Sequence, residues 1–305
     1  MKRNFIATFA HIGLLVALAV SACANAATPG PSDRLRIVAT TTIVGDIVRN
    51  VAGAGVEVTV LLAPGVDPHE YEPAPADVRA VSQAAIVLAN GAGLEPWLAR
   101  LMDSSGGSAR VLTLSNGLAL RTLEGDGVAE DDPHVWLDVA NAIHFAERAR
   151  DGLIESDPAN DTVYRANAER YVAELRELDA WIESQVEVLP AEARLLVTNH
   201  DTFGYFAARY GFTLVGTVFP AGGAEASPSA QDIAGLIGAI RAAGAKAVFT
   251  ENTLNADLAS VIAQEAGVSV VGTLYTDSLG PPDSPAATYI GLMRHNVQTI
   301  VEALK

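Results

Sequence analysis

The sequence predicts an α/β protein with two lobes, each a mostly parallel four-stranded sheet with flanking helices, joined by one long rigid helix. Strand patterns alternate with helix patterns in both halves of the chain, which is typical of parallel sheets covered by helices. An uninterrupted helical pattern separates the halves. The length of 305 residues, half of them hydrophobic and 18% charged, is sufficient for two domains with sizeable cores. The predicted divisions are a signal region (1–26), a tether (27–33), a first lobe (34–156), a linking helix (157–188) and a second lobe (189–305).

The first 26 residues have the layout of a secretory signal. A basic start precedes an apolar run from about Phe5 to Val20, which is short for a membrane span, and small residues follow it. The segment Val20-Ser21-Ala22-Cys23 resembles a bacterial lipobox, in which Cys23, the only cysteine of the chain, would carry lipid. Cleavage after Ala26 is the alternative. We therefore expect an exported protein, either free in the periplasm or anchored to the outer face of the cytoplasmic membrane through lipidated Cys23, with 27–33 as a flexible tether.

The mature chain is strongly acidic. The formal net charge is −16, and without residues 1–26, which hold Lys2 and Arg3, 18 basic and 36 acidic side chains remain, a net charge of −18. This balance disfavours nucleic acid and anionic membrane surfaces as partners and weakly favours cationic ligands. Acidity that only keeps the protein soluble is the simpler explanation, so charge alone selects no function.

The first lobe contains four strand patterns separated by helix patterns. Because ligands of such sheets bind outside the carboxyl ends of the strands, the loops that follow these strands are the expected site. We expect strands at 35–40, 56–62, 84–90 and 110–115, and helices through Ile47 and Val51, from about Ala76, at 94–102 and over the segment WLDVANAIHFAERA that follows His134.

The linking helix is predicted by apolar or small residues that recur every three or four positions. They are Tyr164, Ala168, Tyr171, Leu175, Leu178 and Ile182. Asp157 is a suitable N-cap, Pro158 suits the first helical turn, and Pro190 ends the element. A helix of about 30 residues spans roughly 45 Å. That length exceeds one small domain, so the helix is expected to join two lobes.

The second lobe repeats the alternation. A capping box of Ser229 and Asp232 should open a helix that runs to Gly244. An amphipathic helix closes the chain, with Ile290 and Val297 on its apolar face. Strands are expected at 194–198, within 211–220, at 245–252 and within 268–280.

The tripeptide Asp-Pro-His occurs twice, at 67–69 and 132–134. A histidine in a proline-rich loop is commonly only solvated, but two such loops in one lobe favour a ligand role for His69 and His134. Proline restrains the backbone before each imidazole. Neighbouring carboxylates could orient a ring by accepting its second N–H, or could equally be turn formers. These carboxylates belong to Asp67, Glu70, Asp132 and Asp138.

His200 and Asp277 follow strands of the second lobe in the same way. Each lobe then offers two candidates at the edge that faces the other lobe. Three imidazoles and one carboxylate, with no thiolate, suit a borderline divalent cation such as Zn²⁺. Asp277 taken alone would be a turn former, and His144 and His295 are expected at the surface.

At these residues the sequence resembles the zinc- and manganese-binding solute-binding proteins of bacterial metal ABC importers. Five segments follow the family's order on both sides of the linking helix, and the match covers nearly the whole mature chain: GVDPHEYEP, DPHVWLD, NHDTFGYFAARYGF, SPSAQDIAGLI and TLYTDSLG. The resemblance implies two four-stranded lobes, a rigid linking helix and a metal buried between the lobes. The ligands it implies are His69, His134, His200 and Asp277, with Glu251 in reserve for the fourth position.

The sequence favours Zn²⁺ as the transported ligand and keeps Mn²⁺ as the alternative. Many zinc-uptake members carry a histidine-rich loop before the second Asp-Pro-His, whereas residues 117–132 are acidic and lack histidine, as expected for a solvated surface turn. Manganese-binding relatives often lack that loop too, but they typically place Glu where this chain has His200. A nitrogen-rich site prefers Zn²⁺, while Mn²⁺ prefers oxygen donors.

The expected function is extracytoplasmic capture of this metal by a monomer and its delivery to an ABC permease, without enzymatic turnover. A metal-dependent hydrolase would need three protein ligands, an open position and a base such as Glu251. The motifs H-E-x-x-H and G-x-S-x-G are absent from the sequence. A surface adhesin is the other alternative, and the chain has no repeats to support it. Because a helix hinges less freely than crossing strands, we expect modest movement of the lobes.

Overall fold

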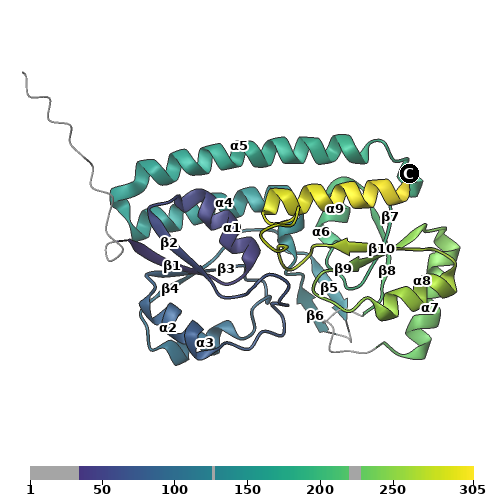
Figure 1. Cartoon of the computed structure of the whole chain (residues 1–305), viewed down its shortest axis with the longest axis horizontal. Coiled ribbons are helices and arrows are strands. Elements are labelled where there is room, and N and C mark those ends of the chain that lie inside the picture. Colours follow the sequence, from purple (N-terminus) through teal and green to yellow (C-terminus); the bar gives the residue numbers. More distant parts are fainter. Residues whose placement is uncertain (1–33, 126–127, 220–227) are drawn as a thin grey trace, which may run out of the picture. The chain divides into compact units, whose positions relative to one another are not determined.

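The computed structural model describes residues 34–125, 128–219 and 228–305 (Figure 1). The signal region, the lipobox with Cys23 and the tether lie outside the described residues. Among the helices that are described, none has the length and apolar character needed to cross a lipid bilayer.

The first lobe is built on one parallel sheet with the strand order β2-β1-β3-β4. Its strands are β1 (Leu35–Ala39), β2 (Val56–Val60), β3 (Ile86–Ala89) and β4 (Arg110–Thr113). The helices are α1 (Thr42–Ala52), α2 (Pro75–Gln83), α3 (Leu98–Ser105) and α4 (Val139–Ser156), with α1 and α4 covering one face of the sheet and α2 and α3 the other (Figure 1). All four strands were predicted, each slightly longer than observed. The predicted helix at 94–102 begins only at Leu98.

The segment 117–132 contains a β-hairpin where the sequence predicted a surface turn. Strands β5 (Thr122–Gly125) and β6 (Val128–Asp131) pair antiparallel, with Thr122 opposite Asp131. The sequence places Asp126-Gly127 between them, a dipeptide that favours tight hairpin turns. The hairpin ends directly before the second Asp-Pro-His.

The linking helix α5 spans Asp161–Val186, which is shorter at both ends than the predicted 157–188. A 3₁₀ turn, Pro158–Asn160, precedes it. The Asp157 carboxylate accepts hydrogen bonds from the Tyr164 hydroxyl (2.6 Å) and the Asn160 amide (2.7 Å), so this side chain is engaged instead of capping the helix. The predicted apolar face is buried throughout, and it packs against α4, α1 and α9 (Tyr289–Leu304). A single apolar core therefore runs along α5 from the first lobe into the second.

The second lobe has four strands that form two parallel pairs, β7 with β8 and β9 with β10. Strands β7 and β9 lie side by side at the centre (Figure 1). The predicted capping box of Ser229 and Asp232 is present at the start of α7. The strands are β7 (Leu195–Thr198), β8 (Thr213–Thr217), β9 (Ala247–Glu251) and β10 (Ser269–Leu274), and the helices besides α9 are α6 (Gly204–Tyr210), α7 (Ala230–Ala243) and α8 (Asp257–Ala266).

The buried face of α5 should be a main source of stability. Leu175 is fully buried in the core shared by the lobes, so Leu175→Ala should lower the free energy of unfolding by about 2–5 kcal/mol. Glu177→Ala, on the exposed face of the same helix, should change it by no more than about 0.5 kcal/mol. Urea denaturation followed by circular dichroism measures both. Equal losses in the two variants would contradict the assigned helix face.

Candidate metal centre

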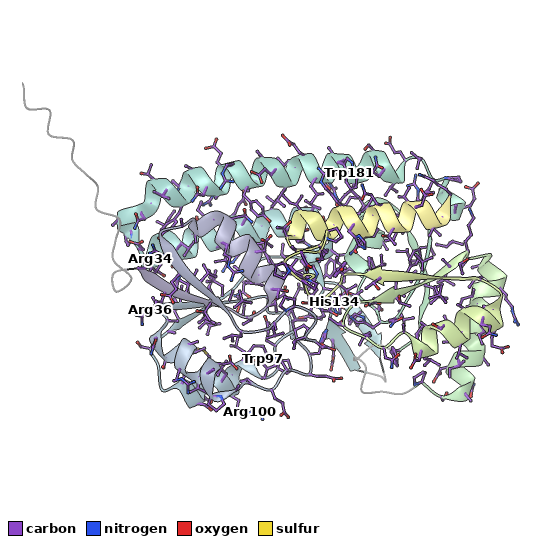
Figure 2. The ribbon with its side chains drawn as sticks, viewed as in Figure 1. Arg34, Arg36, Trp97, Arg100, His134 and Trp181 are labelled. Atoms are coloured by element: carbon purple, nitrogen blue, oxygen red, sulfur yellow. The ribbon has the colours of Figure 1, made fainter. Side chains whose placement is uncertain are left out.

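The structure brings the four candidate side chains together. His69 lies in the loop after β2, His134 precedes the 3₁₀ turn that leads into α4, His200 follows β7 and Asp277 follows β10. One nitrogen or oxygen atom from each residue lies within 4.8 Å of the corresponding atoms of the other three. Figure 2 places His134 in the middle of the ribbon, between the strand ends of the two lobes.

Three contacts between side-chain atoms of the cluster are close to the spacing of ligands around a small cation. The Nε2 atoms of His69 and His134 are 3.3 Å apart. Asp277 places Oδ2 3.2 Å from His200 Nε2 and Oδ1 3.7 Å from His134 Nε2. Ligands about 2.0–2.1 Å from a tetrahedral Zn²⁺ lie roughly 3.3–3.4 Å from one another. With all four donors within 4.8 Å of one another, the cluster is slightly wider than a tetrahedral zinc site.

The cluster is nearly shielded from solvent. His134, His200 and Asp277 are 2%, 5% and 2% exposed, whereas His69 is half-buried. The open side of the cluster is therefore the His69 side.

Two carboxylates hold the rear nitrogens of the buried rings. His134 Nδ1 lies 2.8 Å from Asp132 Oδ1, and His200 Nδ1 lies 2.6 Å from Glu251 Oε2. Each contact directs the Nε2 atom of its ring toward the cluster, as in metal sites where a carboxylate orients a histidine ligand. Glu251, predicted as the reserve for the fourth position, instead lies behind His200. It also accepts hydrogen bonds from the backbone N–H groups of Asn199 (2.8 Å) and His200 (3.1 Å).

Asp67 and Asp138, near the Asp-Pro-His motifs, bind backbone N–H groups. Asp67 Oδ1 accepts the His69 backbone N–H (2.8 Å), which fixes the loop and not the ring. Asp138 caps α4 by accepting the Ala140 N–H. Of the four carboxylates predicted to orient a ring, the one seen in this contact is Asp132.

The charge states of the cluster follow from burial and from these carboxylates. Burial lowers the pKa of His69 to about 4, and the neighbouring His134 adds repulsion. Burial also disfavours the charged form of His200, but the carboxylates of Glu251 and Asp277 outweigh it and raise its pKa well above the ordinary value. Burial opposes ionisation of Asp277 too, yet the attraction of His200 holds the pKa of that carboxyl well below its usual range.

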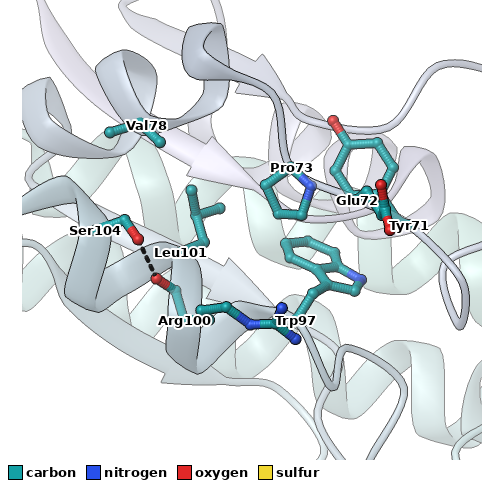
Figure 3. Close-up of a pocket in the computed structure, with 8 residues that line it drawn as sticks. All are labelled: Tyr71, Glu72, Pro73, Val78, Trp97, Arg100, Leu101 and Ser104. Carbon is teal, nitrogen blue, oxygen red and sulfur yellow. Dashed lines mark hydrogen bonds between the residues drawn. The ribbon is translucent and has the colours of Figure 1, made fainter.

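The loop that carries His69 is supported from the first lobe. The Trp97 indole Nε1 donates to the Pro68 carbonyl (2.8 Å), and the Tyr71 ring packs edge-on against Trp97 with centroids 5.1 Å apart. Both rings line a cavity of about 360 Å³, and Figure 3 shows them among the residues that line it. The four cluster residues do not line this cavity, so it is separate from the candidate metal site.

Hydrogen bonds join the ligand-bearing loops across the lobes. Ser278, next to Asp277, accepts the Gly65 N–H (2.8 Å) from the His69 loop. The Trp136 indole, close to His134, donates to the Thr276 carbonyl (3.0 Å). The loops are therefore connected to each other directly as well as through the shared core.

The two remaining histidines of the described chain lie outside the cluster. His144 and His295 were predicted at the surface, and both are half-buried with a ring nitrogen 3.0–3.1 Å from a backbone carbonyl. These contacts give both rings a structural role.

Comparison with known proteins finds relatives that are named as metal-binding. The family profile described as "Zinc-uptake complex component A periplasmic" matches residues 37–303. The manganese-binding lipoprotein MntA of Halalkalibacterium halodurans is 38% identical over 97% of this chain and 98% of its own. The iron-binding protein YfeA of Yersinia pestis is 34% identical over 89% of this chain and 88% of its own.

Solved structures of similar proteins share the fold. The Mn-bound periplasmic metal-binding protein from Candidatus Liberibacter asiaticus superposes with a TM-score of 0.82 at 29% identity, over 89% of this chain and all of its own. The periplasmic zinc-binding protein TroA from Treponema pallidum gives a TM-score of 0.81 at 30% identity, over 89% of this chain and 99% of its own.

The Trp97 contact should support metal affinity through the His69 loop. Trp97→Phe keeps the aromatic ring but leaves the Pro68 carbonyl without its donor, so Zn²⁺ affinity should fall by about 3- to 10-fold, the factor that one buried hydrogen bond supplies. The control is Trp181→Phe in α5, whose half-buried ring stacks with Arg294. Competition against a chromogenic zinc chelator measures both. Equal affinities in the two variants would contradict a supporting role for Trp97.

Proposed function

The chain belongs to the family of periplasmic zinc-uptake complex component A proteins, and from this premise we propose that it captures Zn²⁺ outside the cytoplasmic membrane and delivers it to an ABC permease. Members of this family are metal-binding, substrate-binding proteins of ABC importers and not enzymes. The metal is the cargo. Delivery requires that the site hold the ion without transforming anything bound to it.

The observation that supports the zinc assignment is the donor set. Three imidazole nitrogens and one carboxylate converge within 4.8 Å of one another, and the two shortest contacts among them are 3.2 and 3.3 Å. Nitrogen donors favour Zn²⁺ over Mn²⁺. Four protein donors also fill a tetrahedral shell, which leaves no position for a reactive water and argues against a hydrolase. Glu251, the base that a hydrolase would need, is engaged by His200 and by two backbone N–H groups.

Mn²⁺ is the second candidate, and the names of similar proteins are the support for it. A protein 38% identical to this chain is named as manganese-binding, and a similar solved structure is described as Mn-bound. The half-buried side of the cluster at His69 could admit a further oxygen ligand, as Mn²⁺ would prefer. The two metals therefore need a direct comparison.

We also propose that the mature protein is a monomer held at the membrane by lipid on Cys23. Relatives 27–38% identical to the chain are named as lipoproteins. An anchored binding protein would stay close to its permease after capture.

The test of function is metal binding by the purified mature protein. Zn²⁺ should bind one to one and more tightly than Mn²⁺, and His200→Ala should weaken Zn²⁺ binding by on the order of 100-fold or more, since losing a ligand exceeds the 10- to 100-fold cost of losing its partners. His295→Ala, a half-buried histidine bonded to the Thr273 carbonyl, should bind as the unaltered protein does. Native mass spectrometry and calorimetry give stoichiometry and affinity. Tighter Mn²⁺ binding would reassign the cargo, and zinc binding unaffected by His200→Ala would refute the site.

Metal binding should release protons. The raised pKa of His200 means that the metal-free site holds a proton at neutral pH, and a metal must displace it. Below that pKa, apparent affinity should rise up to tenfold for each unit of pH increase, and it should level off above it. Calorimetry in buffers of different ionisation enthalpy should count about one released proton at pH 7. An affinity that is constant from pH 5.5 to pH 8 would contradict this charge assignment.

A further inference from the structure

The buried Glu95, outside the candidate metal site, forms hydrogen bonds that lead toward His134. Glu95, in the segment between β3 and α3, is 8% exposed and forms no ion pair within the described residues. Its Oε1 accepts hydrogen bonds from the Thr40 hydroxyl (2.7 Å) and the Asn90 N–H (2.8 Å), and its Oε2 accepts the Gly91 N–H (2.9 Å). A buried carboxylate without a cation is costly to maintain, and burial raises the pKa of Glu95.

The turn that Glu95 holds has an uncommon backbone conformation. Gly91, Ala92 and Gly93 all have positive φ, at 85°, 52° and 85°, and Ala92 is the one non-glycine residue of the described chain with positive φ. Such conformations persist only where the surroundings impose them. A Cβ at position 91 would also clash with Thr113. The contacts of Glu95 to two successive N–H groups supply part of this constraint.

The turn presents Asn90 to the second Asp-Pro-His motif. Asn90 is fully buried, and its Nδ2 donates to the Pro133 carbonyl (2.9 Å) and to the Gly91 carbonyl (2.9 Å). Pro133 directly precedes His134, so this contact fixes the peptide from which the His134 ring projects. Hydrogen bonds thus run from Glu95 through Asn90 to the carbonyl of Pro133, the residue directly before the cluster histidine His134.

The second lobe contains the same arrangement in a shorter form. Asn199 follows strand β7 as Asn90 follows β3, and one carboxylate, that of Glu251, accepts the N–H groups of both Asn199 and His200. There the second N–H of the pair belongs to a cluster histidine, whereas in the first lobe it belongs to Gly91. In each lobe, a buried glutamate therefore accepts the N–H groups of an asparagine and of the residue after it, close to the candidate metal site.

We propose that Glu95 is a positioning residue of the metal site, acting through Asn90 and the Pro133 carbonyl to hold His134 in place for a divalent cation. The inference rests on the proposed metal-binding function and extends it to a residue that contacts none of the four donors. Glu95 touches neither the metal nor its ligands, so its effect is on geometry. In the second lobe, Glu251 contacts the His200 ring directly, so no intermediate residue is needed to position that ring.

The test is Glu95→Gln, which keeps the shape but sets an amide donor against one of the two backbone N–H groups. Zn²⁺ affinity should fall by about 10-fold, the lower end of the cost of losing a residue behind a ligand. In the metal-free protein the ¹⁵N and ¹H signals of the His134 ring, assigned by comparison with His134→Gln, should shift. The matched control is Asp46→Asn. The half-buried Asp46 carboxylate, in α1, accepts the Tyr289 N–H (2.9 Å) outside the cluster, so this variant should lose stability and keep both affinity and the His134 signals.

Asn90→Ala provides a second route to the same measurement if Glu95→Gln folds poorly. It removes the contact to Pro133 while leaving the Glu95 acceptors in place, and it should weaken Zn²⁺ binding to a similar extent. The double variant should have a Zn²⁺ affinity no lower than that of whichever single variant binds less tightly, because the two residues act in series. Single variants that lower the melting temperature but bind Zn²⁺ within twofold of the unaltered protein, with unshifted His134 signals, would overturn the proposal. Failure of the unaltered protein to bind Zn²⁺ or Mn²⁺ would refute the proposed function instead, and the His134 signals would still decide the role of Glu95.

Discussion

The structure depends on how the negative charges of the carboxylates at one buried cluster are compensated. The carboxylates of Asp277, Glu251 and Asp132 lie in or directly behind it, and all three residues are almost fully buried. Charges removed from water in this way must be compensated by protons or by a cation. Among the imidazoles, His200 has the raised pKa that allows it to supply part of that compensation. A divalent ion bound by three neutral imidazoles and one carboxylate would carry about one net positive charge, which the two rear carboxylates then stabilise.

The placement of the cluster follows from the fold. His69, His200 and Asp277 follow the carboxyl ends of strands, and His134 follows the hairpin. Because these four residues come from both lobes, neither lobe holds a complete site. Helix α5 and the core beneath it set the distance between the lobes, and the contacts of Ser278 with Gly65 and of Trp136 with Thr276 join the donor loops directly. These connections support the expectation of modest lobe movement. The more exposed side of the cluster is the half-buried His69 side, where Trp97 and Tyr71 pack behind the loop.

The sequence was sufficient to predict the α/β lobes, the buried face of the linking helix and the four residues that meet in the cluster. Repetition of Asp-Pro-His and the position of His200 and Asp277 after strands carried that information. The role of Glu251 was not predictable, because a carboxylate 51 positions away in sequence reaches His200 only through the neighbouring strands β7 and β9. The same applies to Glu95, whose acceptor contacts depend on the shape of a turn. The start of α5 differs from the predicted one because a 3₁₀ turn, Pro158–Asn160, precedes it, while the Asp157 carboxylate accepts hydrogen bonds from the Asn160 amide and the Tyr164 hydroxyl. The hairpin could have been predicted from the dipeptide Asp126-Gly127, which favours tight hairpin turns.

Three imidazoles and one carboxylate should enclose a bound Zn²⁺ completely. X-ray absorption spectroscopy at the zinc edge of the loaded protein measures this shell directly. The expected spectrum shows four light-atom ligands at about 2.0–2.1 Å, with the multiple scattering of three imidazole rings and no bound water. A shell with fewer than three imidazoles, or with five or six ligands that include water, would rule out such a closed site.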